Sequence, residues 1–469
     1  MSNGFAYLSA TELLSLYKRK AISPVEVAKA LLARAASSQA RINAFCLIDE
    51  AATLRQARQS ERRWLKGQPV GRLDGVPVSI KDVVLTRGWP TLRGSRAVNP
   101  RQPWEEDAPS VARLREHGAV FLGKTTTPEY GWQGITESPL TGITRNPWDP
   151  SKTSGGSSGG AGAALAAGLG PLAIGSDGAG SIRIPSAFCG VVGFKANAGR
   201  VPVYPASPFG TIAHVGPMAR TVADIALMLN VIAEPDARDW YGLPFDGTDF
   251  ARGLGAGIKG LRIAFSANLG YTVVDAEVAT YVRQAVRVLA ELGARVEHMD
   301  PGFSNPHDLI LVNWFVGAHR LVSQYTPARQ RRMDPGLLAI ARKGKGIPLA
   351  PYLDAQEQRA ALGRHMRAFH ERYDLLVTPT MPIAAFPVGE SAPRRPGSKK
   401  GRWLDWSPFT YPFNLTSQPA ISVPCGLTRA GLPVALQIVG ANYREALVLR
   451  AAYAFEQTSG RLPVPPGWS

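Results

Sequence analysis

Short runs of apolar, mostly branched residues recur along the chain, and several of them are separated by segments with helical spacing of apolar residues. Runs of this length, bounded by turn formers, are typical of buried strands. They occur at PVSI before Lys81, AVFL (119–122), LAI before Gly175, RIAF (262–265), LLVT (375–378), AISV (420–423) and VALQIV (434–439). The helical patterns span residues 109–117, 223–232 and 278–292. This order predicts an α/β fold with a sheet covered on its faces by helices.

Two helix starts are marked near the beginning of the chain. Ser9 with Glu12 and Ser23 with Glu26 each fit the S-x-x-E capping box, in which each side chain bonds to the backbone N–H of the other residue. Pro24 follows the second serine, at the first position of the expected helix. Apolar residues then continue at helical spacing, which predicts a helical N-terminal segment.

The whole chain, residues 1–469, is expected to form a single domain. Its helical N-terminal segment spans about residues 1–65, and a core segment follows at about 66–235. Residues from about 300 to 402 contain more aromatic and charged residues and several prolines and glycines, which favours helices and loops laid over the sheet. This last segment is a candidate substrate-shaping cap.

The composition, 45% hydrophobic and 19% charged residues, is that of a globular protein able to bury a large core. No stretch reaches the roughly 18 to 20 consecutive apolar residues of a membrane span, and the start lacks the pattern of a signal peptide. We therefore expect a soluble, cytoplasmic protein. Cys46, Cys189 and Cys425 lie far apart without a CxxC pair, and the histidines show no metal-ligand spacing, so neither a metal nor a cofactor is expected.

The formal net charge of +17 raises the question of a nucleic-acid partner. Lysines and arginines are mostly scattered along the chain. The one dense run, RRPGSKKGR from Arg394 to Arg402, contains proline and glycine and is typical of a loop. We interpret the charge as a solvated surface and expect no nucleic-acid partner.

Glycine clusters surround three serines in the middle of the chain. GGSSGG (155–160) contains Ser157 and Ser158, and GSDGAGSIR contains Ser181. Glycine clusters are typical of backbone that approaches another group closely. A further pattern, GAVFLGKT (118–125), matches a phosphate-binding loop as written, but its apolar middle predicts a strand and the preceding segment is helical. We interpret it as a strand followed by a turn.

The residues alone leave open which serine reacts and what takes its proton. GGSSG fits the G-x-S-x-G nucleophile elbow with Ser157 as the attacking group, yet polar turn formers precede it where an elbow requires a buried strand. A histidine-based triad also stays open, because its members converge only in the fold. Lys81 is a third possibility, since it ends an apolar run and burial would leave its amine neutral near pH 7. A strand-end lysine that reaches solvent explains the same position equally well.

The segment 144–195, TRNPWDPSKTSGGSSGGAGAALAAGLGPLAIGSDGAGSIRIPSAFCGVVGFK, closely resembles the signature block of the amidase signature family of serine hydrolases. LDGVPVSIKDVVLTRGWPTLRGS around Lys81 is similar to the same family, and weaker similarity continues through GKTTTPEYGW and FNLTSQPAISVPCGL. The resemblance spans most of the chain. It implies the amidase-signature fold, with a large mixed β-sheet covered on both faces by α-helices, and an amidohydrolase that cleaves a C–N amide-type bond through an acyl-enzyme.

Carried over position by position, the resemblance implies that Ser181 is the nucleophile, Ser157, held by a cis peptide bond, is the bridging serine, and neutral Lys81 is the base. It implies an oxyanion hole of backbone N–H groups from Gly178, Ala179, Gly180 and Ser181. The family usually carries a larger residue and then glycine at the first two of these positions. Supporting side chains are expected at Ser154, Ser158, Asp177 and Arg183. Of these, Ser154 could brace Lys81 or cap a turn.

One branch of the family releases ammonia from glutamine within a transfer-RNA amidotransferase complex. In that branch an acidic residue just before the stretch matching TYPFNL binds the substrate ammonium, whereas Ser407 occupies the position here and Asp405 lies close upstream. We therefore expect neutral aryl or alkyl amides, anilides or carbamates as substrates, with possible esterase or urethanase side activity. The residues expected to line the substrate pocket are Tyr130, Gly131, Trp132, Trp406, Phe409 and Tyr411.

Two alternatives remain at this stage. The first is the glutamine-hydrolysing subunit of a transfer-RNA amidotransferase complex, and the second is a basic nucleic-acid-binding protein on an inactive hydrolase scaffold. For the favoured interpretation the partner is a small amide or carbamate molecule, and the chain is expected to be a monomer or a homodimer.

Overall fold

The computed structural model describes residues 3–393 and 404–469. The strands of these residues are β1 (Phe45–Ile48), β2 (Pro77–Lys81), β3 (Val120–Thr125), β4 (Glu137–Ser138), β5 (Gly142–Ile143), β6 (Leu172–Asp177), β7 (Val192–Lys195), β8 (His214–Ala219), β9 (Arg262–Phe265), β10 (Arg295–His298), β11 (Leu375–Pro379), β12 (Ala420–Leu427) and β13 (Pro433–Gly440).

The helices of the same residues are α1 (Ala10–Lys18), α2 (Pro24–Ile42), α3 (Glu50–Leu65), α4 (Pro109–Glu116), α5 (Gly159–Ala166), α6 (Arg183–Cys189), α7 (Val222–Ile232), α8 (Ala276–Glu291), α9 (His307–Ser323), α10 (Pro327–Gln330), α11 (Pro335–Lys345), α12 (Leu349–Arg372), α13 (Pro412–Leu415) and α14 (Glu445–Ser459). Short 3-10 helices lie at Asn3–Phe5, Glu129–Gly131, Gly210–Ile212 and Leu254–Ala256.

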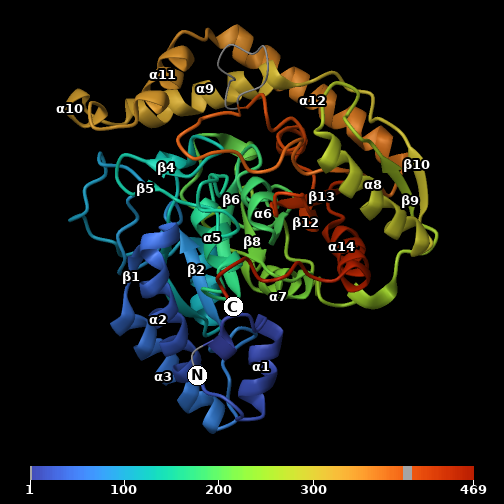
Figure 1. Cartoon of the computed structure of the whole chain (residues 1–469). Helices are drawn as coiled ribbons and strands as arrows, with labels where there is room; N and C mark the ends of the chain where they lie inside the picture. Colours follow the sequence, from blue (N-terminus) through green and yellow to red (C-terminus); the bar gives the residue numbers. More distant parts are fainter. Residues whose placement is uncertain (1–2, 394–403) are drawn as a thin grey trace.

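In the described residues, one eleven-stranded sheet has the order β1-β3-β2-β6-β8-β7-β12-β13-β11-β9-β10, and β4 and β5 form a separate hairpin. The pairs β3/β2, β2/β6, β11/β9 and β9/β10 are parallel, and the remaining neighbours are antiparallel. The sheet is therefore mixed, as predicted. Figure 1 shows α1–α3 at one end of the molecule and α9–α12 along the opposite end.

Alternate residues of the central strand β6 face two different helical layers. Leu172 and Ile174 belong to the large core cluster that also contains α7 and α14 residues, whereas Ala173 packs in a cluster with Ala161 and Leu165 of α5. Successive side chains of a strand point to opposite faces of a sheet. Helices thus cover both faces, and the predicted fold class is confirmed.

The glycine-rich helix α5 is buried on every side because it is built almost entirely of glycine and alanine. A Cβ atom at Gly160 would lie 2.4 Å from Thr126 Oγ1, and one at Gly159 would lie 2.3 Å from Thr136 Oγ1. Neither position has room for a side chain. The absence of side chains lets α5 sit directly against the sheet, which places the serines before it next to the ends of β2 and β6.

The predicted strands and helices are present near the expected positions, and both capping boxes form, at Ser9/Glu12 and Ser23/Glu26. GAVFLGKT contributes β3, whose six residues are all buried, so the strand interpretation of that pattern is confirmed. The sequence patterns missed β1, β7, β8, β10 and the β4/β5 hairpin. Strand β8 includes Gly216 and Pro217, residues that ordinarily argue against a sheet interior.

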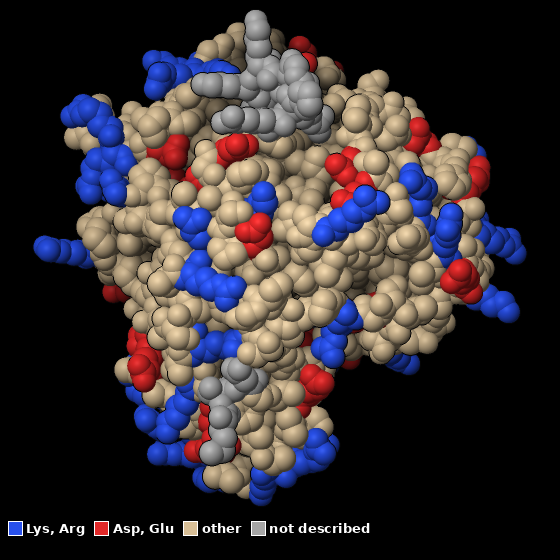
Figure 2. Space-filling view, viewed as in Figure 1, with Lys and Arg blue, Asp and Glu red and all other residues tan. Residues whose placement is uncertain are grey.

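Lysine and arginine side chains are spread over the face drawn in Figure 2, with acidic side chains between them. The dense basic run at 394–402 lies outside the described residues. Among the described helices, none is both long enough and apolar enough to cross a bilayer.

Candidate active site

A lysine and a serine lie close together at the carboxyl ends of two neighbouring parallel strands. Strand β2 ends at Lys81, and its partner β6 runs alongside with Ile80 opposite Ile174, so that Ser176 follows at the same edge. Lys81 Nζ lies 2.8 Å from Ser176 Oγ and 2.7 Å from Ser157 Oγ. Lys81 is therefore held between two hydroxyl groups.

The Lys81 ammonium would be in an unfavourable environment, because the side chain has no exposed surface. Burial lowers the pKa of Lys81 well below its usual 10.5, and the charge of Asp177 opposes that shift only in part. Within residues 3–393 and 404–469, no carboxylate forms an ion pair with Lys81. A neutral amine with a free lone pair is favoured at this position.

Ser157 and Ser181 both line one cavity of about 420 Å³. The Gly156–Ser157 peptide bond is cis, and Ser157 is 2% exposed against 6% for Ser181. Among the described residues, the Ser181 hydroxyl has no hydrogen-bond partner, and no hydrogen bond joins it to Ser157. The structure thus brings Lys81 into contact with Ser157 and places Ser181 on the same cavity wall, with its hydroxyl unengaged.

The loop before Ser181 is shaped by the carboxylate of Asp177. The N–H of Gly180 donates to Asp177 Oδ1 at 2.7 Å, and the N–H of Ile182 donates to Asp177 Oδ2 at 3.2 Å. The expectation that Gly180 contributes an oxyanion donor is corrected here, because its N–H is already engaged. In the described part of the chain, the N–H groups of Gly178, Ala179 and Ser181 have no protein acceptor, which leaves them available.

Arg183 fixes Asp177 in turn. Its guanidinium donates to Asp177 Oδ2 at 3.0 Å through Nε and to Oδ1 at 2.9 Å, and neither side chain has any exposed surface. Burial on its own would raise the pKa of Asp177, but the charge and hydrogen bonds of Arg183 outweigh it and hold that pKa below its usual range. Asn414 of α13 adds an N–H bond to Asp177 Oδ1 at 2.9 Å. The pair is a buried clamp on the loop and not a surface ion pair.

Ser154 and Ser158 make structural hydrogen bonds. Ser154 Oγ donates to the carbonyl of Thr144 at 3.2 Å and makes no hydrogen bond to Lys81. Ser158 Oγ donates to the Ser176 carbonyl and accepts from the Ser176 N–H, each at 3.2 Å. Ser158 thereby ties the start of α5 to the end of β6.

The structure divides the predicted pocket residues into two groups. Tyr130 and Gly131 line the cavity. Trp132, Trp406, Phe409 and Tyr411 do not line it, and all four are at most 7% exposed and packed in the interior. Trp406, for example, stacks on Phe188 with ring centroids 5.9 Å apart. Further aromatic surface on the cavity wall comes from Phe209, Trp314 and Tyr325. Trp314 and Tyr325 lie in the segment 300–402 that was expected to form a cap, whereas no sequence pattern connected Phe209 to the site.

Gly178 has a specific packing role in this wall. A Cβ atom at Gly178 would lie 2.8 Å from the Trp314 ring, so no larger residue fits beside that ring in its present position. Trp314 stacks on Phe209 with centroids 4.4 Å apart and an interplanar angle of 25°. The glycine that departs from the family pattern thus lies against an aromatic pair beside the loop that precedes Ser181.

The geometry does not support a triad with histidine as the base. His214 is the one described histidine on the cavity wall, and its Nδ1 bonds to the carbonyls of Ile212 and Asp177 at 2.9 and 3.2 Å. It makes no hydrogen bond to Ser157 or Ser181. No group of three or more His, Cys, Asp or Glu side chains among the described residues is placed to hold a metal ion.

Sequence reasoning missed Ser176 and Asn414. Ser176 could have been found from the strand pairing, because it lies two residues after Ile174 on β6, next to the end of β2 that carries Lys81. The signal for Asn414 lay in FNLTSQPAISVPCGL, a block that was noticed only as similarity.

The comparisons with known proteins agree with this geometry. The model of the Amidase family matches residues 26–449. An acylamidase of Rhodococcus erythropolis is 40% identical over 457 residues, covering 96% of this chain and 95% of that protein. One of the subunits of the glutamyl-tRNA(Gln) amidotransferase from Moorella thermoacetica is 36% identical over 478 residues, covering 97% of each. The crystal structure of a bacterial aryl acylamidase of the amidase signature family superposes with a TM-score of 0.90 at 31% identity, covering 97% of this chain and 96% of that chain. This chain belongs to the amidase signature family.

Proposed function

We propose that this protein hydrolyses neutral aryl or alkyl amides, anilides or carbamates through an acyl-enzyme on Ser181. The observation that carries the proposal is the contact of 2.7 Å between the buried Lys81 amine and the Ser157 hydroxyl, on the wall of the cavity that Ser181 also lines. A neutral amine beside a hydroxyl is a general base in position.

In the first half-reaction, Ser181 Oγ attacks the substrate carbonyl carbon while its proton passes to Ser157 and the Ser157 proton passes to Lys81. No hydrogen bond to the described residues holds the Ser181 hydroxyl away from this relay, and Ser157 lies on the same cavity wall. The carbonyl oxygen becomes an oxyanion next to the N–H groups of Gly178, Ala179 and Ser181. Donors placed in this way contribute about 3 kcal/mol each to transition-state stabilisation.

The C–N bond then breaks, and the leaving nitrogen receives the proton that Lys81 returns through Ser157. An ester between the acyl group and Ser181 Oγ remains. Water attacks this ester with Lys81 and Ser157 again removing a proton, and the acid product leaves with Ser181 restored. Lys81 is neutral at the start and at the end of the cycle.

Among the described residues, the cavity wall combines aromatic and aliphatic surface with one basic side chain, Arg93, and offers no free carboxylate to a cationic substrate. Phe209, Trp314 and Tyr325 provide aromatic surface, and the only carboxylate among the described lining residues is Asp177, which Arg183 already neutralises. An aromatic ring or alkyl chain would be stabilised there by burial of apolar surface. The similarity to two acylamidases points in the same direction.

Glutamine hydrolysis is the second candidate, favoured by the similarity to the amidotransferase. Its substrate carries an ammonium that needs a carboxylate partner. Ser407 is buried with its hydroxyl donating to the Leu404 carbonyl at 3.3 Å, and the Asp405 carboxylate lies 3.0 Å from His307. Neither residue lines the cavity, so the described residues offer the ammonium no such partner.

A substrate panel tests the proposal. Acetanilide, a phenyl carbamate ester, an aliphatic amide and glutamine are compared by kcat/KM, and intact mass spectrometry detects the acyl adduct. We expect the aryl amide or the carbamate to exceed glutamine by at least about tenfold, the ratio expected for about 1.4 kcal/mol of discrimination. Ser181→Ala should abolish both turnover and adduct, while Ser110→Ala, which removes another hydroxyl on the cavity wall, keeps the adduct. A preference for glutamine, or an adduct retained in Ser181→Ala, would refute the proposal.

A further inference from the structure

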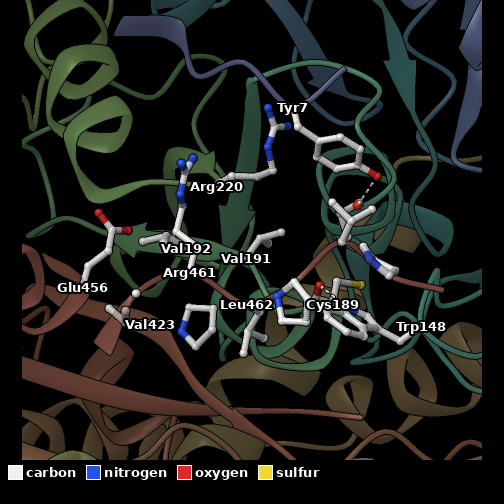
Figure 3. Close-up of a pocket in the computed structure, with 17 residues that line it drawn as sticks. Tyr7, Trp148, Cys189, Val191, Val192, Arg220, Val423, Glu456, Arg461 and Leu462 are labelled. Atoms are coloured by element: carbon white, nitrogen blue, oxygen red, sulfur yellow. Dashed lines mark hydrogen bonds between the residues drawn. The ribbon is translucent and has the colours of Figure 1, made fainter. Parts of the chain in front are cut away.

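A second cavity lies beneath the C-terminal segment 460–465, and we call it the tail pocket (Figure 3). Its volume is about 290 Å³, and it shares no lining residue with the catalytic cavity. Most of its wall is apolar, contributed by Val191, Val192, Val423, Leu462 and the prolines of the tail. A cavity of this size with a few polar groups has the character of a small-molecule site.

One of those polar groups is the guanidinium of Arg220, which follows β8. It donates to the carbonyls of Gly170 at 2.7 Å, Leu8 at 2.8 Å and Leu165 at 3.2 Å. No carboxylate among the described residues forms an ion pair with it. Burial lowers its pKa to about 10, and the charge of Asp224 opposes that shift only in part. A mostly buried cation without a contacting anion is unusual, because buried charges are ordinarily paired.

A second guanidinium, that of Arg461, lies on the same cavity wall. Its charge contributes to lowering the pKa of Arg220, which places the two cations within electrostatic reach of each other. Arg461 has no hydrogen bond or ion pair in residues 3–393 and 404–469. Figure 3 shows its side chain between those of Glu456 and Arg220.

Glu456 is the only acidic residue among the described residues of the wall. Its carboxylate already accepts the Val222 N–H at the start of α7, at 2.9 and 3.2 Å. Burial raises the pKa of Glu456 to about 7, so its negative charge is weakened at neutral pH. On the pocket wall, two guanidiniums therefore accompany one carboxyl group, while Asp224 and Glu12 act on Arg220 through their charges without contacting it.

The tail pocket also contacts the two helices that follow the catalytic serines. Ala166 ends α5 and Cys189 ends α6, and both line the pocket, while Ser157 and Ser181 lie just before the opposite ends of these helices. A helix of seven or eight residues is roughly 10–12 Å long. The pocket thus sits about one short helix length behind the catalytic serines.

We propose that the tail pocket is a binding site for a small carboxylate with an apolar body, whose anionic group lies between Arg220 and Arg461 and whose body lies against Val191, Val192 and Leu462. The ligand supplies a directly contacting anion, which neither guanidinium has among the described residues, and charge-assisted hydrogen bonds to arginine are the strongest of their kind. Its apolar part replaces water on the valine and leucine surface.

The test uses 4-bromobenzoate as the probe. Its dissociation constant is measured by calorimetry with the wild-type protein, and anomalous scattering from bromine locates it in co-crystals. We expect bromine density in the tail pocket. The uncharged isostere 4-bromobenzyl alcohol should bind at least about tenfold more weakly, because it lacks the charged group.

Arg461→Gln removes one cation without removing any hydrogen bond or ion pair among the described residues, and we expect it to weaken 4-bromobenzoate binding roughly fivefold. Arg58→Gln, which changes an exposed arginine on α3 outside the pocket, is the matched control and should leave the dissociation constant unchanged. Bromine density confined to the catalytic cavity, or absent, would overturn the proposal. So would an unchanged dissociation constant in Arg461→Gln, or equal binding of the alcohol.

Discussion

The surroundings of Lys81 and Lys124 differ although the two lysines lie on adjacent strands. Lys124 is opposite Ile80 in the β2/β3 pair, and both lysines have no exposed surface. Lys124 Nζ donates to the Val84 carbonyl at 2.6 Å and to the Thr91 hydroxyl at 2.9 Å, with Asp82 Oδ1 at 4.0 Å. Lys81 Nζ meets only the hydroxyls of Ser157 and Ser176 within hydrogen-bond distance, among the described residues.

The difference shows that burial alone does not make a lysine a base. A carbonyl or carboxylate oxygen only accepts, so the groups around Lys124 favour the protonated ammonium, whereas a hydroxyl either donates or accepts and so tolerates a neutral amine. Burial lowers the pKa of Lys124 to about 8 and the pKa of Lys81 well below its usual value. At neutral pH we therefore expect Lys124 charged and structural, and Lys81 neutral and reactive.

The largest expected effect separates the two lysines by substitution. Lys81→Met should lower kcat/KM by about 10⁴-fold without lowering the melting temperature, because it removes the general base but no buried counter-ion. Lys124→Met should instead leave kcat/KM close to that of the wild type. It should cost about 3 kcal/mol of unfolding free energy, since it leaves the Asp82 carboxylate without its cation. The measurements are steady-state kinetics and urea unfolding of both variants.

A catalytic loss in Lys124→Met that matched the loss in Lys81→Met, with full stability, would remove the distinction between the two sites.

The next prediction concerns pH. Only the neutral form of Lys81 accepts a proton, so kcat/KM should rise about tenfold per pH unit at low pH and level off well below pH 10.5, because the folded pKa is depressed. Between the depressed pKa of Lys81 in the folded protein and its usual value of 10.5 in the unfolded chain, the folded protein binds fewer protons at Lys81 than the unfolded chain does. The contribution of Lys81 to stability therefore rises with pH across that window.

Profiles of kcat/KM and of unfolding free energy against pH, for wild type and Lys81→Met, check both statements. A stability profile that is identical in the two proteins would contradict a depressed pKa at Lys81.

The smallest predicted effect compares one hydroxyl from each lysine site. Ser176→Ala removes one of two partners of the Lys81 amine and should lower kcat/KM by about tenfold, with about 1 kcal/mol of stability lost. Thr91→Val removes a hydroxyl partner of Lys124 and should cost similar stability. We expect kcat/KM within about twofold of wild type, because the Thr91 hydroxyl takes no part in the reaction. If both variants lost activity equally, Ser176 would have no special position beside the base.

Much of this arrangement was predictable because it depends on local patterns. The run before Lys81 and the run before Gly175 were recognisable strands, and the glycine clusters marked close packing around α5. Strand β8 was not recognisable, because Gly216 and Pro217 break the pattern. They are tolerated since β8 pairs with β7 only at Met218 and Ala219, and a Cβ at Gly216 would lie 2.4 Å from the Phe194 carbonyl oxygen.

The substrate pocket was the least predictable part, for a physical reason. An aromatic residue near a motif packs equally well in a core or on a cavity wall, and sequence does not distinguish the two. Trp406, Phe409 and Tyr411 are core residues, whereas Trp314 and Phe209, 105 positions apart in the chain, stack to form the wall. That pairing depends on where α9 packs against the segment before β8, which no local pattern records.

The most direct test of the central claim is the protonation state of Lys81 in the folded protein. Lysine ¹³Cε signals of the labelled protein would be followed by NMR from pH 6 to pH 11, with Lys81→Met and Lys124→Met used to assign the two buried lysines. The account predicts that the Lys81 signal already has the chemical shift of a neutral amine at pH 7, where Lys124 is still charged. A Lys81 signal that titrates near pH 10.5, together with the exposed lysines, would contradict it.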